Sequence, residues 1–418
     1  MEKGGKKKII VLSDHALSTS GVGTQTRHLI NGLLKKGCWS FRQLGAAVQH
    51  DNYDTVVVNP DFVIKPTDGF GTQEMIRVIL ATEKPDAILI FTDPRFFTWL
   101  FEIEDEIHQV CPIFWWHVWD NCPYPEFNDR FYEATDLINC HSHHTYTQLM
   151  SKYPEKTNFI PHALPEDVFY EVSESKKAML KKQVVGHDRQ DHFVGFWMNR
   201  NAKRKRPGDL LWAWKLFIDK LEKEEGHKNA VLLLHTDPLD REGPNLYSLV
   251  DHLKIKDTIM FSKDRVGFDV INAMHNIADF TINISNAEGF GLSTLEAMQT
   301  GTPIIAPMTG GQTRQVVDYR DQSENGFALP IELQTLVGSQ TVPYIYEDYV
   351  STHTIADKIW EMYSLGPKAR YNLGQKAKNY VKSEFSYQKT IDRWHETMLE
   401  KLSNWKKSYK RYTLKEIK

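Results

Sequence analysis

The chain has 418 residues, of which 41% are hydrophobic and 25% charged, so it is long enough for two or three hydrophobic cores. Its net charge of −3 excludes the strongly basic balance typical of nucleic-acid-binding proteins. No apolar run reaches the ~18 residues of a membrane span, and the first is too short for a secretory signal. The four cysteines show no zinc-ligand spacing and are too few for a disulfide scaffold, so we expect a reduced, cytoplasmic protein.

Short apolar runs alternate with helical patterns in the first part of the chain. The expected strands are residues 8–13, 55–59, 87–92, 113–117 and 137–140. The expected helices are residues 24–36, 72–83, 95–110 and 146–152. This alternation is typical of βαβ units around a parallel sheet, whose strands are covered on both faces.

A polar stretch, residues 165–191, contains the expected domain junction, and a second alternation follows it. Its expected strands are residues 193–198, 230–236, 258–261, 278–284 and 303–307, and its expected helices are 207–224, 247–253, 266–276 and 293–300. Residues 333–349 are expected to form an irregular surface insertion. Two helices, 354–364 and 368–384, then precede a final amphipathic helix over 387–407.

The most informative segment is S-N-A-E-G-F-G-L-S-T-L-E-A-M, residues 285–298. An expected strand ends near Ser285, a loop with two glycines follows, and a helix is expected to open near Ser293. Backbone N–H groups of such a loop and the helix N-terminus form an anion site. Glu288 lies in this loop, where a carboxylate could accept hydrogen bonds from sugar hydroxyls. Glu296 lies one turn into the helix, where a capping box with Ser293 would explain it without any ligand.

The two glutamates, in the setting E-G-F-G-L-x-x-x-E-A-M, resemble the E-x₇-E signature of retaining glycosyltransferases of family 4. The next segment, G-T-P-I-I-A-P-M-x-G-G over residues 301–311, is similar to that family's following strand and glycine pair. The resemblance implies an α/β protein of the GT-B fold, with two Rossmann-like, doubly wound parallel-sheet domains facing across a cleft. In the family the first glutamate contacts the transferred sugar and the second the nucleotide ribose; Glu288 and Glu296 hold these positions. The resemblance also predicts donor contacts from the loop and helix start, by Gly289, Phe290, Gly291, Leu292 and Ser293.

A basic segment, M-N-R-N-A-K-R-K-R-P over residues 198–207, lies between an expected strand and an expected helix. By the resemblance, Arg200 and Lys205 hold the donor diphosphate, and preorganised cations there stabilise the charge that develops as the glycosidic bond breaks. Asn199 stands where the family usually has glycine. The family's lysine role therefore stays open among Lys203, Arg204, Lys205 and Arg206. A solvated basic face or an RNA-binding patch is the less favoured alternative, because the rest of the chain has no basic excess.

Two further motifs lie in the first half of the chain. Gly21 and Gly23, in G-V-G-T-Q-T, match neither a Walker A loop nor a complete Rossmann fingerprint. By the resemblance, this loop faces the cleft, and a glycine amide contacts the donor phosphate or the acceptor. His117 ends an expected strand, where a lone histidine is usually structural. The resemblance instead places it beside the anomeric centre, as a catalytic residue with Glu288, Arg200 and Lys205, and Trp119 and Asp120 would shape the acceptor site.

No D-x-D pair follows an expected strand, as one would in a metal-dependent glycosyltransferase, so we predict no catalytic metal and no cofactor. The resemblance predicts an acceptor-binding domain over residues 1–164 and a donor-binding domain over 165–385. Residues 386–418 would form a helix that packs back on the first domain. The predicted reaction moves a hexosyl group, with retention, from a nucleoside-diphosphate sugar such as a UDP- or GDP-hexose to a glycan, lipid or protein acceptor. Peripheral membrane contact is compatible with this prediction, and no nucleic-acid partner or transmembrane segment is expected.

The base, the sugar and the acceptor stay open, and so do two other functions. One is a GT-B nucleotide-sugar epimerase or phosphorylase, which the E-x₇-E spacing disfavours. The other is a non-catalytic nucleotide-sugar-binding protein. The two glutamates also differ in expected effect. Replacing Glu288, which has no cap to make, should lower turnover with little loss of stability, whereas replacing Glu296 should weaken donor binding and remove a helix cap.

Overall fold

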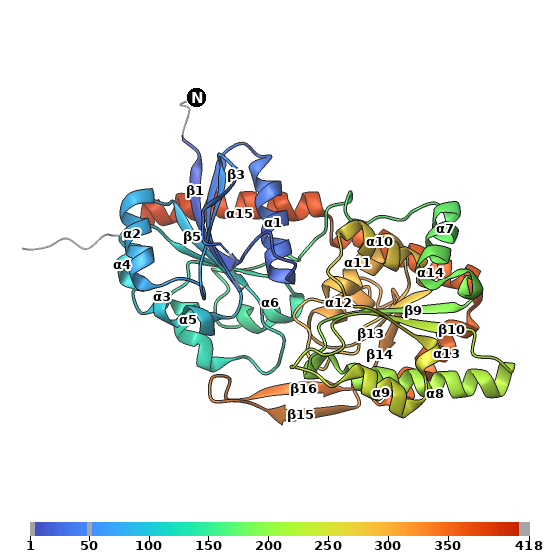
Figure 1. Ribbon diagram of the computed structural model, residues 1–418. Coiled ribbons are helices and arrows are strands. Elements are labelled where there is room, and N and C mark those ends of the chain that lie inside the picture. The colour runs from blue at the N-terminus through green and yellow to red at the C-terminus, as the bar shows by residue number, and fades with distance from the viewer. Residues whose placement is uncertain (1–4, 48–51, 409–418) are drawn as a thin grey trace, which may run out of the picture. The chain divides into compact units, whose positions relative to one another are not determined.

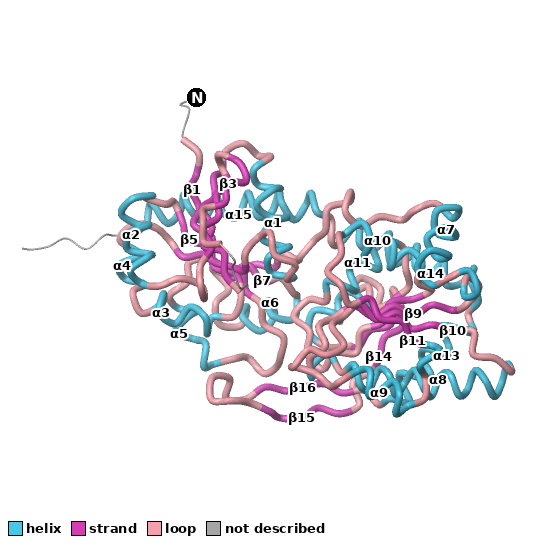
Figure 2. Tube along the Cα trace, viewed as in Figure 1, coloured by secondary structure: helices cyan, strands magenta, loops and turns pink. Residues whose placement is uncertain are grey.

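The structure is a computed structural model that describes residues 5–47 and 52–408. It comprises two compact units (Figures 1 and 2). Unit 1 consists of the chain up to Ala163, the short segment Ser339–Pro343 and the chain from Tyr387 onward. Unit 2 consists of Leu164–Gly338 and Tyr344–Ser386.

Within the described residues, unit 1 contains an eight-stranded sheet in the order β3-β4-β2-β1-β5-β6-β7-β8. Neighbouring strands are parallel except at the edge, where β3 runs antiparallel to β4. The central strands are buried on both faces, which explains their continuous apolar runs. The strands are β1 (Lys7–Asp14), β2 (Trp39–Ala46), β3 (Val56–Asn59), β4 (Phe62–Pro66), β5 (Ala87–Phe91), β6 (Ile113–His117), β7 (Leu137–Cys140) and β8 (Thr157–Phe159).

Two hydrophobic cores cover the two faces of this sheet. Alternation along β6 sends Trp115 into one core and Trp116 into the other. The helices of unit 1 are α1 (Gly21–Leu34), α2 (Gln73–Glu83), α3 (Thr98–Phe101), α4 (Glu104–His108), α5 (Asp129–Glu133), α6 (His143–Met150) and α15 (Tyr387–Ser408).

The final helix, α15, packs beside α1 in unit 1 (Figure 1). Trp394 of α15 is fully buried and its ring meets that of Trp116 edge-on at 5.0 Å. The hydroxyl of Tyr387 donates to the carbonyl of His28, at 2.6 Å. Gly32 permits the close approach of the two helices, because a Cβ at that position would collide with Ile391. Of the segment 386–418 that the sequence assigns to this packing, residues 409–418 lie outside the described part of the chain.

Unit 2 contains, among its described residues, a parallel six-stranded sheet in the order β11-β10-β9-β12-β13-β14 and a separate two-stranded hairpin. The strands are β9 (Phe193–Met198), β10 (Ala230–His235), β11 (Ile259–Ser262), β12 (Phe280–Ile282), β13 (Ile304–Pro307), β14 (Phe327–Leu329), β15 (Leu333–Val337) and β16 (Ile345–Tyr349). The helices are α7 (Glu174–Val185), α8 (Pro207–Glu225), α9 (Leu246–Leu253), α10 (Phe268–Ile277), α11 (Leu292–Thr300), α12 (Thr313–Val316), α13 (Thr352–Ser364) and α14 (Gly366–Glu384).

Several elements differ from those predicted. The expected irregular insertion over 333–349 is wrong, because β15 and β16 pair there as an antiparallel hairpin. Leu333 and Leu336 of this hairpin are exposed. Its apolar residues therefore do not alternate with polar ones in the way that indicates a strand with one buried face. Helix α7 was missed because it buries only Val185 and so has no apolar stripe. The helix predicted over 95–110 is instead two short α-helices, α3 and α4, preceded by a 3₁₀ turn.

No helix in the described ranges is both long enough and apolar enough to cross a bilayer.

Candidate functional site

Two loops that carry sequence-predicted site residues meet in unit 2. The basic segment follows β9 and the Glu288 loop follows β12, and these two strands pair in parallel. Their carboxyl ends therefore lie at the same edge of the sheet, where α/β folds bind ligands. There the carboxylate of Glu288 forms an ion pair with the ammonium of Lys205. Both side chains are nearly buried, with exposed fractions of 12% and 8%.

The ion pair fixes the charge state of Glu288. Burial alone would raise the pKa of this carboxyl group. The positive charges of Lys205 and Arg204, with hydrogen bonds, outweigh burial and lower its pKa to about 2. Asn283 Nδ2 also donates to the carboxylate, at 3.4 Å. Glu288 is therefore an anion at neutral pH, held between two cations.

Backbone contacts fix the position of the Glu288 loop. The amide of Asn286 donates to the carbonyl of Arg204 at 2.9 Å, and Arg204 Nη1 donates to the carbonyl of Ala287 at 3.1 Å. On the other side, the amide of Gly311 donates to the carbonyl of Glu288 at 2.9 Å. A Cβ at Gly311 would collide with the Gly289 carbonyl, so only glycine permits this approach. The basic segment and the glycine pair thus hold the loop from two directions.

Helix α11 begins at Leu292 with an uncapped N-terminus. Its N-cap residue is Gly291, in the left-handed region at φ +90°, and no side chain accepts a hydrogen bond there. The capping box predicted between Ser293 and Glu296 is therefore wrong. The first N–H groups of α11, next to Gly289 and Phe290 of the loop, form the kind of helix N-terminus that binds phosphate or another anion.

Glu296, on the second turn of α11, has a different contact. Its Oε2 lies 3.3 Å from Nε2 of His275, which is fully buried on α10. Glu296 itself is 8% exposed.

The sequence did not decide which basic residue takes the family's lysine role, and in the structure these residues have different contacts. Lys205 and Arg204 contact the Glu288 loop. Arg206 instead pairs with Asp209 and donates to the carbonyl of Val350. Arg200, predicted as a diphosphate ligand, has a side chain that is 64% exposed and pairs with Asp240 at 2.7 Å.

The predicted residues of unit 1 lie in a different setting. His117 is fully buried, and its Nε2 lies 3.0 Å from the hydroxyl of Tyr132. Burial and the neighbouring His141 hold the pKa of His117 well below its usual value, so the ring is neutral. The hydroxyl of Thr145 donates to the carbonyl of Trp119, whose side chain is 5% exposed. Asp120 is half-buried, and no role beyond the predicted one is apparent for it.

The glycine loop of unit 1 forms the start of α1. The amide of Gly23 donates to the side-chain oxygen of Ser20, which caps the helix, at 3.0 Å. A Cβ on Gly23 would collide with Ser18, so packing alone requires this glycine. Gly21, the first residue of α1, is exposed. The amide of Gly23 therefore serves the helix cap in this structure, and Gly21 is the more accessible of the two.

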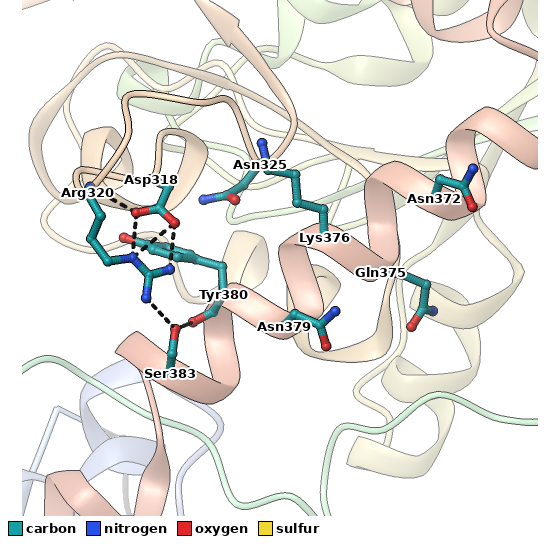
Figure 3. Close-up of a pocket in the computed structure, with 9 residues that line it drawn as sticks. All are labelled: Asp318, Arg320, Asn325, Asn372, Gln375, Lys376, Asn379, Tyr380 and Ser383. Atoms are coloured by element: carbon teal, nitrogen blue, oxygen red, sulfur yellow. Dashed lines mark hydrogen bonds and ion pairs between the residues drawn. The ribbon is translucent and has the colours of Figure 1, made fainter.

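A cavity of about 620 Å³ in unit 2 lies between α14 and the segment around Asp318 (Figure 3). Its charged groups are already paired: Arg320 with Asp318, and Lys376 with the Ser323 hydroxyl. None of its lining residues belongs to the Glu288 loop or the basic segment. We therefore place the candidate site at the loops and not in this cavity. Elsewhere in the described residues, no group of three or more His, Cys, Asp or Glu side chains is arranged to hold a metal ion.

Residues 182–335 match the family model described as glycosyl transferases group 1. The matched residues lie entirely within unit 2. The matched range includes Lys205, Glu288 and Glu296, so the resemblance drawn from the glutamate motif is confirmed.

Two curated relatives match parts of the chain. Alpha-monoglucosyldiacylglycerol synthase of Acholeplasma laidlawii is 29% identical over 158 residues, which cover 37% of this chain and 36% of the relative. N-acetyl-alpha-D-glucosaminyl L-malate synthase of Bacillus anthracis is 23% identical over 228 residues, which cover 54% and 46%. The chain thus spans less than half the length of each of these relatives.

Solved structures resemble the chain over nearly its whole length. Sucrose-phosphate synthase from Thermosynechococcus elongatus has a TM-score of 0.74 at 15% identity, covering 96% of this chain and 100% of that one. HepE from Anabaena, in complex with UDP and glucose, has a TM-score of 0.66 at 15% identity, covering 94% and 100%. Identities this low show the fold alone. The predicted fold class, two parallel-sheet α/β domains of the GT-B type, is confirmed.

The sequence did not reveal every residue of the site. Asn283 directly follows the buried strand β12. Its position at the carboxyl end of a parallel strand, where α/β folds bind ligands, could have indicated it from the sequence. His275 lies on the buried side of α10 and carried no such signal. Its contact with Glu296 spans 21 positions and depends on how α10 and α11 pack.

Proposed function

We propose that this chain is a retaining, metal-independent glycosyltransferase that moves a hexosyl group from a nucleoside-diphosphate sugar to an acceptor hydroxyl. The observation that carries the proposal is the cluster of Lys205, Arg204 and Glu288 beside the uncapped N-terminus of α11. Two cations and a helix N-terminus suit a diphosphate, whose negative charge grows as the sugar leaves. A carboxylate beside them suits the hydroxyls of the sugar.

Each group in unit 2 then has a proposed role. Lys205 and Arg204 bind the diphosphate, assisted by the backbone N–H groups of residues 289–293. Glu288 accepts hydrogen bonds from hydroxyls of the transferred sugar, and Glu296 accepts from the ribose. Arg200 is a further proposed phosphate ligand, which would have to exchange Asp240 for the phosphate.

Roles in unit 1 rest on the family resemblance alone. His117 is proposed beside the anomeric carbon, and Trp119 and Asp120 beside the acceptor. Gly21 and Gly23 are proposed to contribute a backbone amide to the donor phosphate or the acceptor.

The proposed chemistry follows from these assignments. Glu288 is tied to Lys205 and is not proposed as a nucleophile. We propose departure and attack on the same face of the sugar. The bond from the anomeric carbon to the phosphate oxygen breaks, the bond to the acceptor oxygen forms, and the leaving phosphate takes the hydroxyl proton. The cations make this phosphate a better leaving group.

The names of similar proteins guide the choice of ligands. HepE is described in complexes with UDP and with UDP-glucose, and one curated relative is a glucosyldiacylglycerol synthase. We therefore propose a UDP-hexose as the first donor to test, with glycan and lipid acceptors. Within the described residues, none of the four cysteines (Cys38, Cys111, Cys122 and Cys140) forms a disulfide, which supports the cytoplasm as the proposed location.

The test begins with thermal unfolding in the presence of UDP-, GDP- and ADP-hexoses. A ligand at 100 times its Kd should stabilise the protein by about 2.7 kcal/mol. Release of free nucleotide is then measured with and without acceptors, and the products are analysed. Lys205→Ala should abolish the donor response. Lys215→Ala is the matched control, because Lys215 lies on α8, away from the candidate site, and forms an ion pair with Asp219.

Three outcomes would overturn the proposal. Absence of binding to every nucleotide sugar would remove the donor site. Binding without hydrolysis or transfer would make the chain a nucleotide-sugar-binding protein, and an isomerised sugar without an acceptor would make it an epimerase.

A further inference from the structure

His275 is a buried residue that belongs to neither the glutamate motif nor the basic segment. It lies on α10, and both of its ring nitrogens have partners: Nδ1 lies 3.3 Å from the hydroxyl of Thr281, and Nε2 lies 3.3 Å from Oε2 of Glu296. The rings of Phe196 and Phe169 meet the imidazole edge-on, at 4.9 and 6.1 Å. Aromatic packing and two hydrogen bonds therefore fix the orientation of this ring.

The partner groups determine the direction of the hydrogen bonds. A carboxylate only accepts, so Nε2 of His275 carries the proton that points to Glu296. A hydroxyl can donate or accept, so Thr281 suits Nδ1 in either protonation state. The side chain of Glu296 has no other hydrogen bond to a described residue, and its Oε1 is left to accept from a ligand.

A second histidine lies in the same electrostatic neighbourhood. His235 ends β10, and its Nδ1 lies 2.9 Å from the hydroxyl of Ser262 at the end of β11. Burial lowers the pKa of His235, although the negative charge of Glu296 opposes the shift. The charge of Glu296 thus acts on His235, which lies with Ser262 at the carboxyl ends of β10 and β11, the edge where α/β sheets bind ligands.

We infer that His275 is a positioning residue for the nucleotide end of the donor: by holding one oxygen of Glu296, it aims the other at the ribose hydroxyls. This inference rests on the proposed function. The capping box that would have explained Glu296 without a ligand is absent, because α11 begins at Leu292 behind Gly291. Among the described residues, the one hydrogen-bond partner of the Glu296 side chain is His275, which is itself fully buried.

Three variants of the full chain test the inference. His275→Phe keeps a ring of similar size among Phe196 and Phe169 but removes the donor to Glu296. His275→Gln returns a donor near the position of Nε2. Thr302→Val is the matched control, because the Thr302 hydroxyl donates to the backbone carbonyl of His275 and the substitution leaves the imidazole in place.

The readout is the Kd for UDP and for 2′,3′-dideoxy-UDP, which lacks the ribose hydroxyls. We expect His275→Phe to raise the Kd for UDP about tenfold, His275→Gln to raise it about threefold or less, and Thr302→Val to leave it unchanged. All four proteins should bind the dideoxy nucleotide alike. In turnover assays His275→Phe should raise the donor KM about tenfold while kcat stays within about threefold, because the misplaced group is remote from the reacting bond.

Equal binding of UDP by His275→Phe and the wild type would overturn the inference. So would an equal loss for both nucleotides, since the ring would then act only through packing. If His275→Phe does not fold, His275→Leu takes its place with the same two outcomes. A wild type that binds UDP but transfers no sugar refutes the proposed activity alone, and a wild type that transfers sugar while the variants bind normally refutes the role of His275 alone.

Discussion

Replacing Glu288 with glutamine removes one charge from a buried ion pair and keeps the size of the side chain. The pKa of Glu288 is about 2, against an ordinary value of 4.5, so its ionised form contributes about 3 kcal/mol to the stability of the folded chain at neutral pH. The glutamine also removes the negative charge with which Lys205 pairs, and the Lys205 side chain is only 8% exposed. We expect the free energy of unfolding to fall by about 3–4 kcal/mol, within the range for broken buried pairs. Because of this ion pair, we expect Glu288→Gln to lose more stability than the sequence alone predicted.

A double-mutant cycle in urea isolates this interaction. Lys205→Met removes the cation, and the variant carrying both substitutions has no buried charge at either position. The double variant should be more stable than the sum of the single losses predicts, with a coupling of about 2–3 kcal/mol. Losses that add within about 0.5 kcal/mol would show that the two groups do not stabilise each other, and the reasoning from the ion pair would fail.

The pH dependence of the same difference gives an independent check. The pKa of Glu288 is lowered in the folded state, so its stabilisation is fully present above the ordinary value of 4.5 and is lost as pH falls toward about 2. The stability difference between the wild type and Glu288→Gln should stay constant from pH 8 to pH 5 and narrow below that. A difference that persists undiminished at pH 3 would contradict a carboxylate held by Lys205.

Three further predictions concern catalysis and stability. Lys205→Ala should lower kcat about 10²–10³-fold, as loss of a preorganised group does; Arg200→Ala should lower it only about tenfold, because Arg200 must first leave Asp240, and equal losses would give both residues the same phosphate role. Activity should survive EDTA, since side chains supply the positive charge; loss restored only by Mn²⁺ or Mg²⁺ would contradict this. Burial alone would lower the pKa of His108. The carboxylates of Asp136 and Glu104 outweigh burial, so the pKa is raised above its ordinary value. Stabilisation by His108 is thus fully present below pH 6.5 and lost as pH rises through the raised pKa. The stability difference between the wild type and His108→Gln should shrink between pH 6 and pH 9, and a growing difference would reverse the assignment.

The fold was predictable because two kinds of signal agreed. Apolar runs alternating with helical patterns predicted parallel sheets, and the glutamate motif resembled a family with such sheets. Local signals failed where burial did not follow a simple pattern. Strand β2 was missed because Arg42 and Gln43 interrupt its apolar run. The buried Gln43 side chain donates to the Ser13 hydroxyl and the Asp14 carbonyl and accepts from the Ala16 amide.

The sequence named residues of the candidate site, but it could not predict the contacts between them. Glu288 and Lys205 were both named from motifs, yet their ion pair joins positions 83 apart and depends on the pairing of β9 with β12. The choice among the four basic residues needed backbone geometry, because Arg206 adopts a left-handed conformation at φ +53° that begins α8 and turns its guanidinium toward Val350. Likewise, the capping box failed because Gly291, and not Ser293, precedes the helix.

The stability of the fold does not by itself require the ion pair of Glu288 with Lys205 or the uncapped start of α11. Desolvation of a buried lysine–glutamate pair offsets much of its attraction, and two apolar side chains of the same volume often give equal or greater stability. An uncapped helix N-terminus next to that pair adds unsatisfied N–H groups, which a side-chain cap would satisfy with a gain of about 1 kcal/mol. Packing alone therefore explains neither the charges of Lys205 and Glu288 nor the open end of α11. The proposed nucleoside-diphosphate sugar would explain them together, because its phosphates would need the cation and the N–H groups and its hydroxyls would need the carboxylate.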